Sequence, residues 1–378
     1  MTTAHLLPDE PVRFTSACLT RLLIHCQKAG ASDITLQTGE PVFAESYGRL
    51  LRITQRRLSN TEVTETLNLI YGPNGSAQIL SGVDIDTHYE FRPNRNERYR
   101  FRVNATGCLV AGHDAIQISF RTIPSVPPKM SDLNLENPLV AALSPVQGIV
   151  YVTGATGSGK TTLLASIIRD LAEKEDSNRK ILTYEAPIEF VYDSIDMPSA
   201  IVSQSEIPRH LPSFASGVRN ALRRKPRLIL VGELRDPETI SAAIEAALTG
   251  HPVYTTLHSN GVAETLRRLV NSFPAEEAKT RMIDIIETIR VVIWQQLVPS
   301  TDGKRIALRE FLVFNEKLRD FLLDSNLNNI SATTRRMLKE QGQPMSVDAK
   351  QKFDAGLISE RVYKRLMLST ETAEHHEG

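Results

Sequence analysis

The stretch GIVYVTGATGSGKTTLLASIIRDL, residues 148–171, decides the fold of this 378-residue chain. An apolar run precedes a glycine-rich segment, and apolar residues at helical spacing follow it, which predicts a strand, a loop and a helix. Gly154, four further residues and then Gly159-Lys160-Thr161 complete the pattern G-x-x-x-x-G-K-[ST]. The order of elements around this pattern predicts a P-loop nucleotide site in an α/β domain.

Each part of the P-loop pattern has a chemical reason. Glycines let backbone N–H groups wrap phosphates, and the N-terminus of the following helix adds its dipole. We expect Lys160 to meet the β- and γ-phosphates and the Thr161 hydroxyl to ligate Mg²⁺. The chain lacks the Asn-Lys-x-Asp guanine signature, which favours ATP. We therefore predict that ATP and Mg²⁺ bind here, with the nucleotide held by Gly154, Ala155, Thr156, Gly157, Ser158, Gly159, Lys160, Thr161 and Thr162.

Acidic residues are expected at the ends of two further strands. PRLILVGELRD, residues 226–236, places Glu233 just past a buried parallel strand, and KILTYEAPIEF, residues 180–190, places Glu185 at a strand tip. A P-loop needs an acid on a neighbouring strand to hold Mg²⁺ or to orient the attacking water. Glu233 is the predicted catalytic acid and Mg²⁺ ligand, and Glu185 is a second catalytic candidate. For each, the alternative is a solvated loop acid.

A histidine follows another expected strand in GHPVYTTLHSNG, residues 250–261. His258 comes after the apolar run 252–257, and ligands of open α/β sheets bind at such strand ends. No cysteine or second histidine follows at metal-ligand spacing, which disfavours a zinc site. His258 is predicted to lie near the γ-phosphate, either as a hydrogen-bond donor or as a relay to a neighbouring subunit.

The chain is expected to contain two domains. Helical and alternating patterns over residues 1–122 predict an α+β domain with short antiparallel strands. IPSVPPKMSDL, residues 123–133, predicts a proline-rich linker. The ATPase domain with a C-terminal helical extension is then expected at 134–368, and a disordered tail at 369–378.

Arginines recur at alternate positions in RYRFRVN of the first domain. Arg98, Arg100 and Arg102 would share one face of a strand. A solvated strand face and a phosphate-facing arginine set both fit this pattern. An arginine supplied in trans can stabilise the charge of phosphoryl transfer. We hypothesise that Arg100, Arg102 or Arg121 reaches a nucleotide at a domain or subunit boundary, with Arg235 beside Glu233 as a second candidate.

Charge and composition limit the function classes. The 44 basic and 44 acidic side chains cancel, which removes the positive field typical of non-specific nucleic-acid binding. No specific nucleic acid is expected as a partner, although the basic segment NALRRKPR keeps a nucleic-acid translocase as an alternative. No apolar stretch reaches the roughly 18 to 20 residues of a membrane span, so any membrane role is expected to be peripheral. Three cysteines without C-x2-C spacing favour a reducing cytosol.

Four ordered motifs resemble those of one known family. GATGSGKTT, TYEAPIEF, LILVGELRD and GHPVYTTLHSN are similar to the Walker A, Asp box, Walker B and His box of the type II/IV secretion ATPase superfamily. The resemblance spans roughly residues 20–320, and is strongest to the retraction-ATPase branch with its Dot/Icm-type (type IVB) secretion and conjugation relatives. It departs at Ala186, where the family's Asp box commonly has Asp, so no role is carried over to that position.

The resemblance implies a PAS-like N-terminal domain joined to a RecA-like ATPase domain, and a homo-oligomer expected to be a hexamer. It also implies a cytoplasmic ATPase, peripherally associated with the cytoplasmic face of the inner membrane. This enzyme would power a type IVB-like secretion or conjugation apparatus, with inner-membrane or cytoplasmic components of that apparatus as partners. The alternatives are a pilus-retraction ATPase, which shares every catalytic residue, and a nucleotide-gated adaptor with little hydrolysis.

Overall fold

The computed structural model describes the chain except for residues 1–5, 47–48, 96, 124–125, 326–328 and 376–378. It contains two compact units. The first is Met1–Val126 with Pro187–Val191, and the second is Pro127–Ala186 with Tyr192–Gly378. The boundary after Val126 falls inside the predicted linker, of which Pro124 lies outside the described residues. The predicted α/β fold, with an α+β N-terminal domain followed by a RecA-like P-loop domain, is confirmed, and each of the two has its own sheet.

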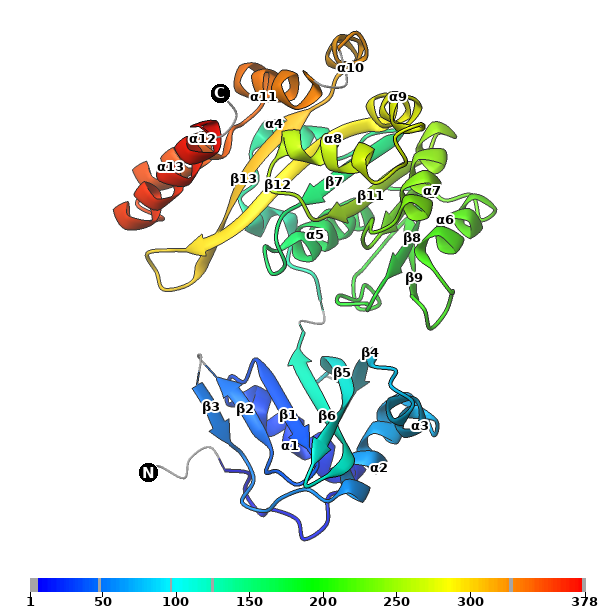
Figure 1. The fold of residues 1–378 in the computed structure, drawn as a ribbon, viewed down its shortest axis with the longest axis vertical. Helices are drawn as coiled ribbons and strands as arrows, with labels where there is room; N and C mark the ends of the chain where they lie inside the picture. The colour runs from blue at the N-terminus through cyan, green and yellow to red at the C-terminus, as the bar shows by residue number, and fades with distance from the viewer. Residues whose placement is uncertain (1–5, 47–48, 96, 124–125, 326–328, 376–378) are drawn as a thin grey trace. The chain divides into compact units, whose positions relative to one another are not determined.

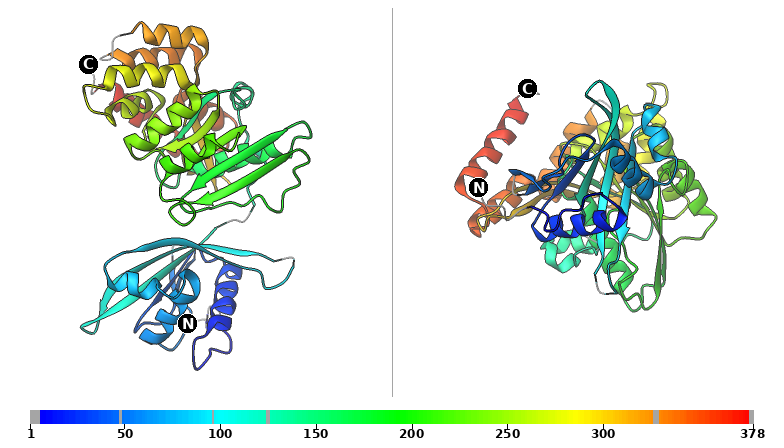
Figure 2. Two further views of the ribbon diagram at one scale, coloured as in Figure 1. Left: turned by 90° about the vertical axis from the view of Figure 1, so that its right-hand side faces the viewer. Right: turned by 90° about the horizontal axis from the view of Figure 1, so that it is seen from below.

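An antiparallel six-stranded sheet organises the first unit, in the order β3-β2-β1-β6-β5-β4 (Figure 1). Residues of β1 alternate, with Ile34 and Leu36 fully buried against the helices and the others half-buried. Figure 2 shows the helices of this unit, in blue, on one face of the sheet. The elements are α1 (Ser16–Lys28), β1 (Asp33–Gln37), β2 (Phe43–Ser46), β3 (Arg49–Arg52), α2 (Asn60–Tyr71), α3 (Gly75–Leu80), β4 (Ile85–Phe91), β5 (Tyr99–Val110) and β6 (His113–Thr122).

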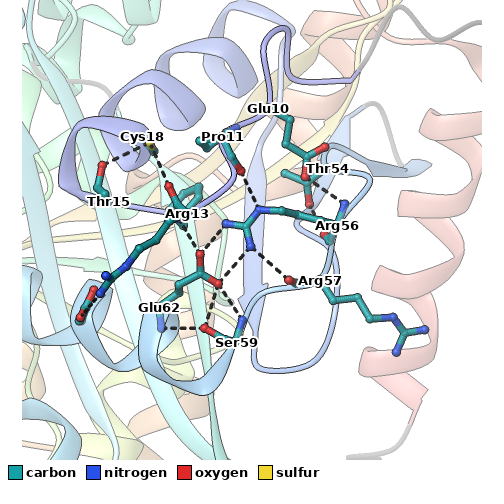
Figure 3. A network of polar contacts seen from close by, with 12 residues as sticks. Glu10, Pro11, Arg13, Thr15, Cys18, Thr54, Arg56, Arg57, Ser59 and Glu62 are labelled. Carbon is teal, nitrogen blue, oxygen red and sulfur yellow. Dashed lines mark hydrogen bonds and ion pairs between the residues drawn. The ribbon is translucent and has the colours of Figure 1, made fainter.

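A buried carboxylate joins the start of α2 to the segments that precede α1 and α2 (Figure 3). Glu62, in the first turn of α2, accepts hydrogen bonds from the Phe14 amide at 2.6 Å and from Arg56 at 2.6 and 3.1 Å. It also accepts from the Ser59 amide at 2.8 Å, which completes a capping box at the start of α2. Burial alone would raise the pKa of Glu62. The hydrogen bonds outweigh this effect and lower the pKa to about 2, and the bond from Arg56 makes the largest contribution to the lowering.

A seven-stranded sheet organises the second unit, in the order β13-β12-β7-β11-β10-β8-β9. All pairs are parallel except β12 with the edge strand β13. The expected strand before the P-loop is β7, whose six residues are all buried. The strands are β7 (Gly148–Thr153), β8 (Arg179–Glu185), β9 (Ala200–Glu206), β10 (Leu228–Val231), β11 (Pro252–Leu257), β12 (Ile289–Pro299) and β13 (Arg305–Val313).

Helices cover both faces of the second sheet (Figures 1 and 2). Ile149 and Tyr151 of β7 pack into one apolar core with α7, α8 and α9, and Val150 and Val152 point to the opposite face. The helices, including the 3-10 helix η2, are η2 (Met130–Leu133), α4 (Asn137–Ala142), α5 (Lys160–Glu173), α6 (Phe214–Leu222), α7 (Pro237–Leu248), α8 (Val262–Asn271) and α9 (Ala278–Thr288).

The described residues of the C-terminal region form four more α-helices. Of these, α12 and α13 pack with the β12–β13 hairpin through a separate apolar cluster that includes Val298, Leu308 and Ala349. The predicted tail at 369–378 overlaps the end of α13, and its last three residues lie outside the described residues. No helix of the described chain combines the length and apolar character that crossing a membrane requires. The four are α10 (Glu316–Leu323), α11 (Ile330–Gln341), α12 (Met345–Asp354) and α13 (Glu360–His375).

Candidate nucleotide site

The P-loop connects β7 to α5 as the sequence predicts. Gly154, Gly157 and Gly159 have φ values of 142°, 76° and 85°, a region that side chains with a Cβ rarely adopt. A Cβ on Gly159 would also lie 2.9 Å from Gln295 Nε2, and one on Gly154 would collide with the Gln295 carbonyl oxygen. The glycines of the pattern therefore stand where both the backbone and the neighbouring strand require them.

Lys160 begins α5 and turns back over its own loop. Its ammonium donates hydrogen bonds to the carbonyl oxygens of Gly154 and Ala155, both at 2.9 Å. The side chain is largely buried. The cation thus lies within the loop formed by the predicted phosphate-binding residues.

Glu185 lies at the tip of β8, beside the start of α5. Its Oε1 accepts hydrogen bonds from the Thr183 hydroxyl at 2.6 Å and from Gln204 Nε2 at 3.1 Å. Glu185 and Thr161 line one small cavity together with Tyr192 and Thr256. Their carboxylate and hydroxyl oxygens are of the kind that Mg²⁺ prefers. The fold thus brings together two residues that are far apart in the sequence, one from the P-loop and one from the Asp box.

Sequence reasoning missed Tyr192 and Thr256 in this cavity. Burial, followed by the charge of Glu185, raises the pKa of Tyr192 well above its usual value. Thr256 donates a hydrogen bond from its hydroxyl to the Gly232 carbonyl oxygen at 2.6 Å. Thr256 is the second-last residue of β11, two positions before His258. Including the last two residues of each expected strand among the site candidates would therefore have found it.

Glu233, His258 and Arg235 form a cluster at the ends of β10 and β11. Oε1 of Glu233 lies 3.2 Å from His258 Nε2, and its Oε2 accepts a hydrogen bond from Arg235 Nε at 2.6 Å. Glu233 is 17% exposed, whereas His258 is 38% exposed. A carboxylate in this arrangement is oriented from both sides and still reaches the surface, where it can accept a proton or a hydrogen bond from water.

The arginines of the first unit are paired with acids. Arg100 is buried, pairs with Glu90 at 3.1 Å and donates to the Ile188 carbonyl oxygen of the same unit at 2.8 Å. Arg102 is held by both oxygens of Asp86, and Arg121 Nε donates to Asp33 at 2.8 Å. Acidic side chains thus balance the positive charge of these three arginines. That an arginine of this set reaches a nucleotide stays a prediction.

No cluster of three or more His, Cys, Asp or Glu side chains suited to a metal occurs among the described residues. A Mg²⁺ ion at a nucleotide commonly uses only one or two protein ligands, and phosphates and water supply the rest. Of the two predicted ligands, Thr161 lines the cavity described above, whereas Glu233 lies in the adjacent cluster with His258.

Comparison with known proteins identifies relatives over most of the chain. The family described as Type II/IV secretion system protein matches residues 86–341. The crystal structure of the Legionella pneumophila ATPase DotB has a TM-score of 0.90 and 66% identity, covering 97% of this chain and 99% of that one. The pilus retraction motor PilT with bound ADP has a TM-score of 0.76 and 28% identity, covering 90% and 95%. The type IV pilus retraction ATPase PilT of Pseudomonas aeruginosa is 35% identical, covering 82% and 86%.

Proposed function

Because this chain belongs to the Type II/IV secretion system protein family, we propose that it is the ring-forming ATPase of a type IVB, Dot/Icm-like secretion or conjugation apparatus. It is an ATP hydrolase of this group of secretion and pilus ATPases. The observation that carries the finer assignment is the 66% identity to DotB over 97% of the chain. PilT of Pseudomonas aeruginosa is 35% identical over 82% of the chain.

The nucleotide is proposed to lie over residues 154–162. Backbone N–H groups of the loop and the Lys160 ammonium would hold the phosphates, as expected for a glycine-rich loop at a helix N-terminus. Thr161 and Glu233 are the proposed Mg²⁺ ligands, and the cavity shared by Thr161 and Glu185 makes Glu185 a further candidate. When bound, Mg²⁺ supplies positive charge that offsets the charge developing on the phosphoryl oxygens.

Glu233 is proposed to orient and deprotonate the attacking water. Its carboxylate is held at one oxygen by Arg235 and approached at the other by His258. Such fixation keeps a catalytic acceptor in place without reorganisation during the reaction. His258 is partly exposed, which fits a second task at the γ-phosphate or at a neighbouring subunit.

We propose a hexamer at the cytoplasmic face of the inner membrane, engaged with components of the secretion apparatus. The PilT-like relatives support the alternative that the chain drives pilus retraction. The two assignments share the catalytic residues, so they differ in the machinery that the motor engages.

Complementation separates the two machineries. The chain would be expressed in Legionella pneumophila lacking DotB and in Pseudomonas aeruginosa lacking PilT, with Lys160→Ala as the inactive control. We expect type IVB secretion to return in the first strain, no twitching motility to return in the second, and no activity from Lys160→Ala. Restored twitching without restored secretion would contradict the assignment and support the retraction motor.

A further inference from the structure

A chain of buried polar contacts runs from the P-loop to the C-terminal helix α12. Gln295 of β12 donates a hydrogen bond from Nε2 to the Ser158 carbonyl oxygen at 2.7 Å. Its other amide atom, Oε1, accepts from Arg309 Nε of β13 at 3.0 Å. Gln295 and Arg309 are each only 3% exposed. One amide side chain thus joins the P-loop to the edge strand of the sheet.

The second half of this series of polar contacts connects β13 to α12. Asp348 of this helix is 1% exposed and accepts a hydrogen bond from the Arg309 backbone amide at 2.7 Å. Lys352, one turn later, donates to Asp348 at 2.6 Å and is largely buried. Breaking a buried ion pair is costly because it leaves one charge without its partner. The hydrogen bond from the Arg309 amide to Asp348 therefore joins α12 to β13 at the residue that contacts Gln295, and Lys352 supplies the buried charge that Asp348 needs.

Arg309 has a third connection within the second unit. Its guanidinium also donates to the Leu133 carbonyl oxygen at 3.1 Å and to the Asn134 carbonyl oxygen at 3.4 Å. These residues end the 3-10 helix η2 and follow directly after it. Arg309 thus contacts the segment around Leu133 and Asn134 and the helix α12, and it is connected to the P-loop through Gln295.

Peptide geometry gives the Gln295 contact a consequence for phosphate binding. A trans peptide is planar, so the Gly159 N–H points away from the Ser158 carbonyl oxygen of the same peptide. Because Gln295 holds the Ser158 carbonyl oxygen, it also fixes the direction of the Gly159 N–H, which points away from Gln295. P-loops bind phosphates through such N–H groups. A loop fixed before binding avoids part of the ordering cost of holding the ligand.

We propose that Gln295 is a positioning residue that aims the Gly159 amide at the nucleotide, and that α12 docked on β13 sets its position through Arg309. The proposal rests on the nucleotide site proposed at residues 154–162. It gives the C-terminal helix a part in nucleotide affinity. Displacement of α12, by a partner or by the neighbouring subunit, then weakens nucleotide binding without touching the nucleotide.

Two Gln→Glu substitutions on β12 test the proposal. Gln295→Glu keeps an oxygen that can accept the hydrogen bond from Arg309, and it replaces the amide N–H that donates to the Ser158 carbonyl oxygen with a second acceptor oxygen. Gln296→Glu makes the same change at the next residue, whose side chain points to the other face of the sheet. The Kd for ADP would be measured by titration calorimetry on the full chain, with the nucleotide-free melting temperature as the control for folding. We expect Gln295→Glu to raise the Kd about tenfold with little change in melting temperature, and Gln296→Glu to leave both unchanged.

Two Asp→Asn substitutions test the α12 end. Asp348→Asn weakens the buried pair, and Asp354→Asn removes the exposed i,i+4 pair with Lys350 on the same helix. We expect the first to raise the Kd for ADP about threefold and the second to have no effect. The double variant Gln295→Glu/Asp348→Asn should bind no more weakly than Gln295→Glu, because both changes act through one connection.

Lys160→Ala distinguishes failure of this inference from failure of the proposed site. If Lys160→Ala binds ADP as tightly as the natural chain, the nucleotide site itself is wrong. If Lys160→Ala loses ADP while Gln295→Glu keeps full affinity, only the role of Gln295 is overturned. Additive losses in the double variant, or an unchanged Kd in Asp348→Asn, would overturn the connection to α12.

Discussion

His258 Nε2 lies 3.2 Å from Glu233 Oε1, across the ends of the neighbouring parallel strands β10 and β11. The two residues follow their strands at the carboxyl edge of the sheet, the edge at which open α/β sheets bind ligands. The P-loop leaves β7 at the same edge. Because β11 lies between β7 and β10 in the sheet, the P-loop, His258 and the proposed catalytic carboxylate follow three successive strands at one edge.

Glu233→Gln should strongly lower the rate of hydrolysis while leaving ADP binding intact. The amide keeps the size of the side chain but cannot accept a proton from water. General-base catalysis contributes typically about 10² to 10⁴ in rate, so turnover should fall by that factor. Steady-state ATP turnover and the Kd for ADP measure the two effects. A variant that hydrolyses ATP at the natural rate would remove Glu233 from the mechanism.

His258 substitutions should lower turnover less than Glu233→Gln does. His258→Ala removes the side chain that approaches Glu233 Oε1, and we expect roughly a tenfold loss in kcat from the less fixed carboxylate. His258→Gln, which retains a donor, should recover part of the activity. His251 directly precedes β11, at the end of the strand opposite to His258, and His251→Ala is the matched control. Equal losses in both alanine variants would indicate a general effect on the strand.

Arg102→Ala and Arg121→Ala test the hypothesis that an arginine of the first unit reaches a nucleotide. Arg121 is exposed, and its pair with Asp33 contributes at most about 1 kcal/mol to stability. A large loss of turnover in Arg121→Ala would therefore report on chemistry and not on folding. We expect at least one of the two variants to lose about 10³-fold in rate, with Asp33→Ala as the control for the ion pair. Natural turnover in both would reject these two candidates.

Acid should destabilise the first unit through Glu62. The pKa of Glu62 is about 2 in the folded chain, against an ordinary 4.5. A lowered pKa stabilises the fold above pH 4.5, and this contribution is lost as the pH falls from 4.5 towards 2. Glu62→Gln should lower the free energy of unfolding by about 1 to 3 kcal/mol near neutral pH and flatten its dependence on pH in that window.

Urea unfolding at several pH values measures the Glu62 effect. Glu65→Gln is the matched control, because Glu65 lies on the same helix and forms only an exposed pair with Arg13. The control should unfold like the natural chain. If the two variants show the same pH dependence, the buried network of Glu62 has no special part in acid stability.

The local motifs could be predicted from the sequence because their geometry is local. The P-loop needs only its glycines and the strand and helix on either side, all within residues 148–171. Glu185, Glu233 and His258 were each placed at a strand end by the same reasoning. Their mutual contacts depend on strand order, and no short segment contains the information that β10 lies between β8 and β11.

Longer-range partners could not be predicted for the same physical reason. Alternation placed Arg100 and Arg102 on one strand, but their acids come from β4 through the register of a hairpin. Gln295 and Ser158 are 137 residues apart, and neither belongs to a motif that would pair them. Buried polar contacts of this kind depend on packing between elements, and periodicity within one element does not encode them.

ATP turnover per subunit, measured against protein concentration with Glu233→Gln as the blank, tests the central claim most directly. A ring whose sites are completed between subunits should show turnover that rises steeply with concentration and falls about 10²-fold or more in Glu233→Gln. A rate that is the same in Glu233→Gln and in the natural chain at every concentration would contradict the account, because Glu233 would then not carry the hydrolysis.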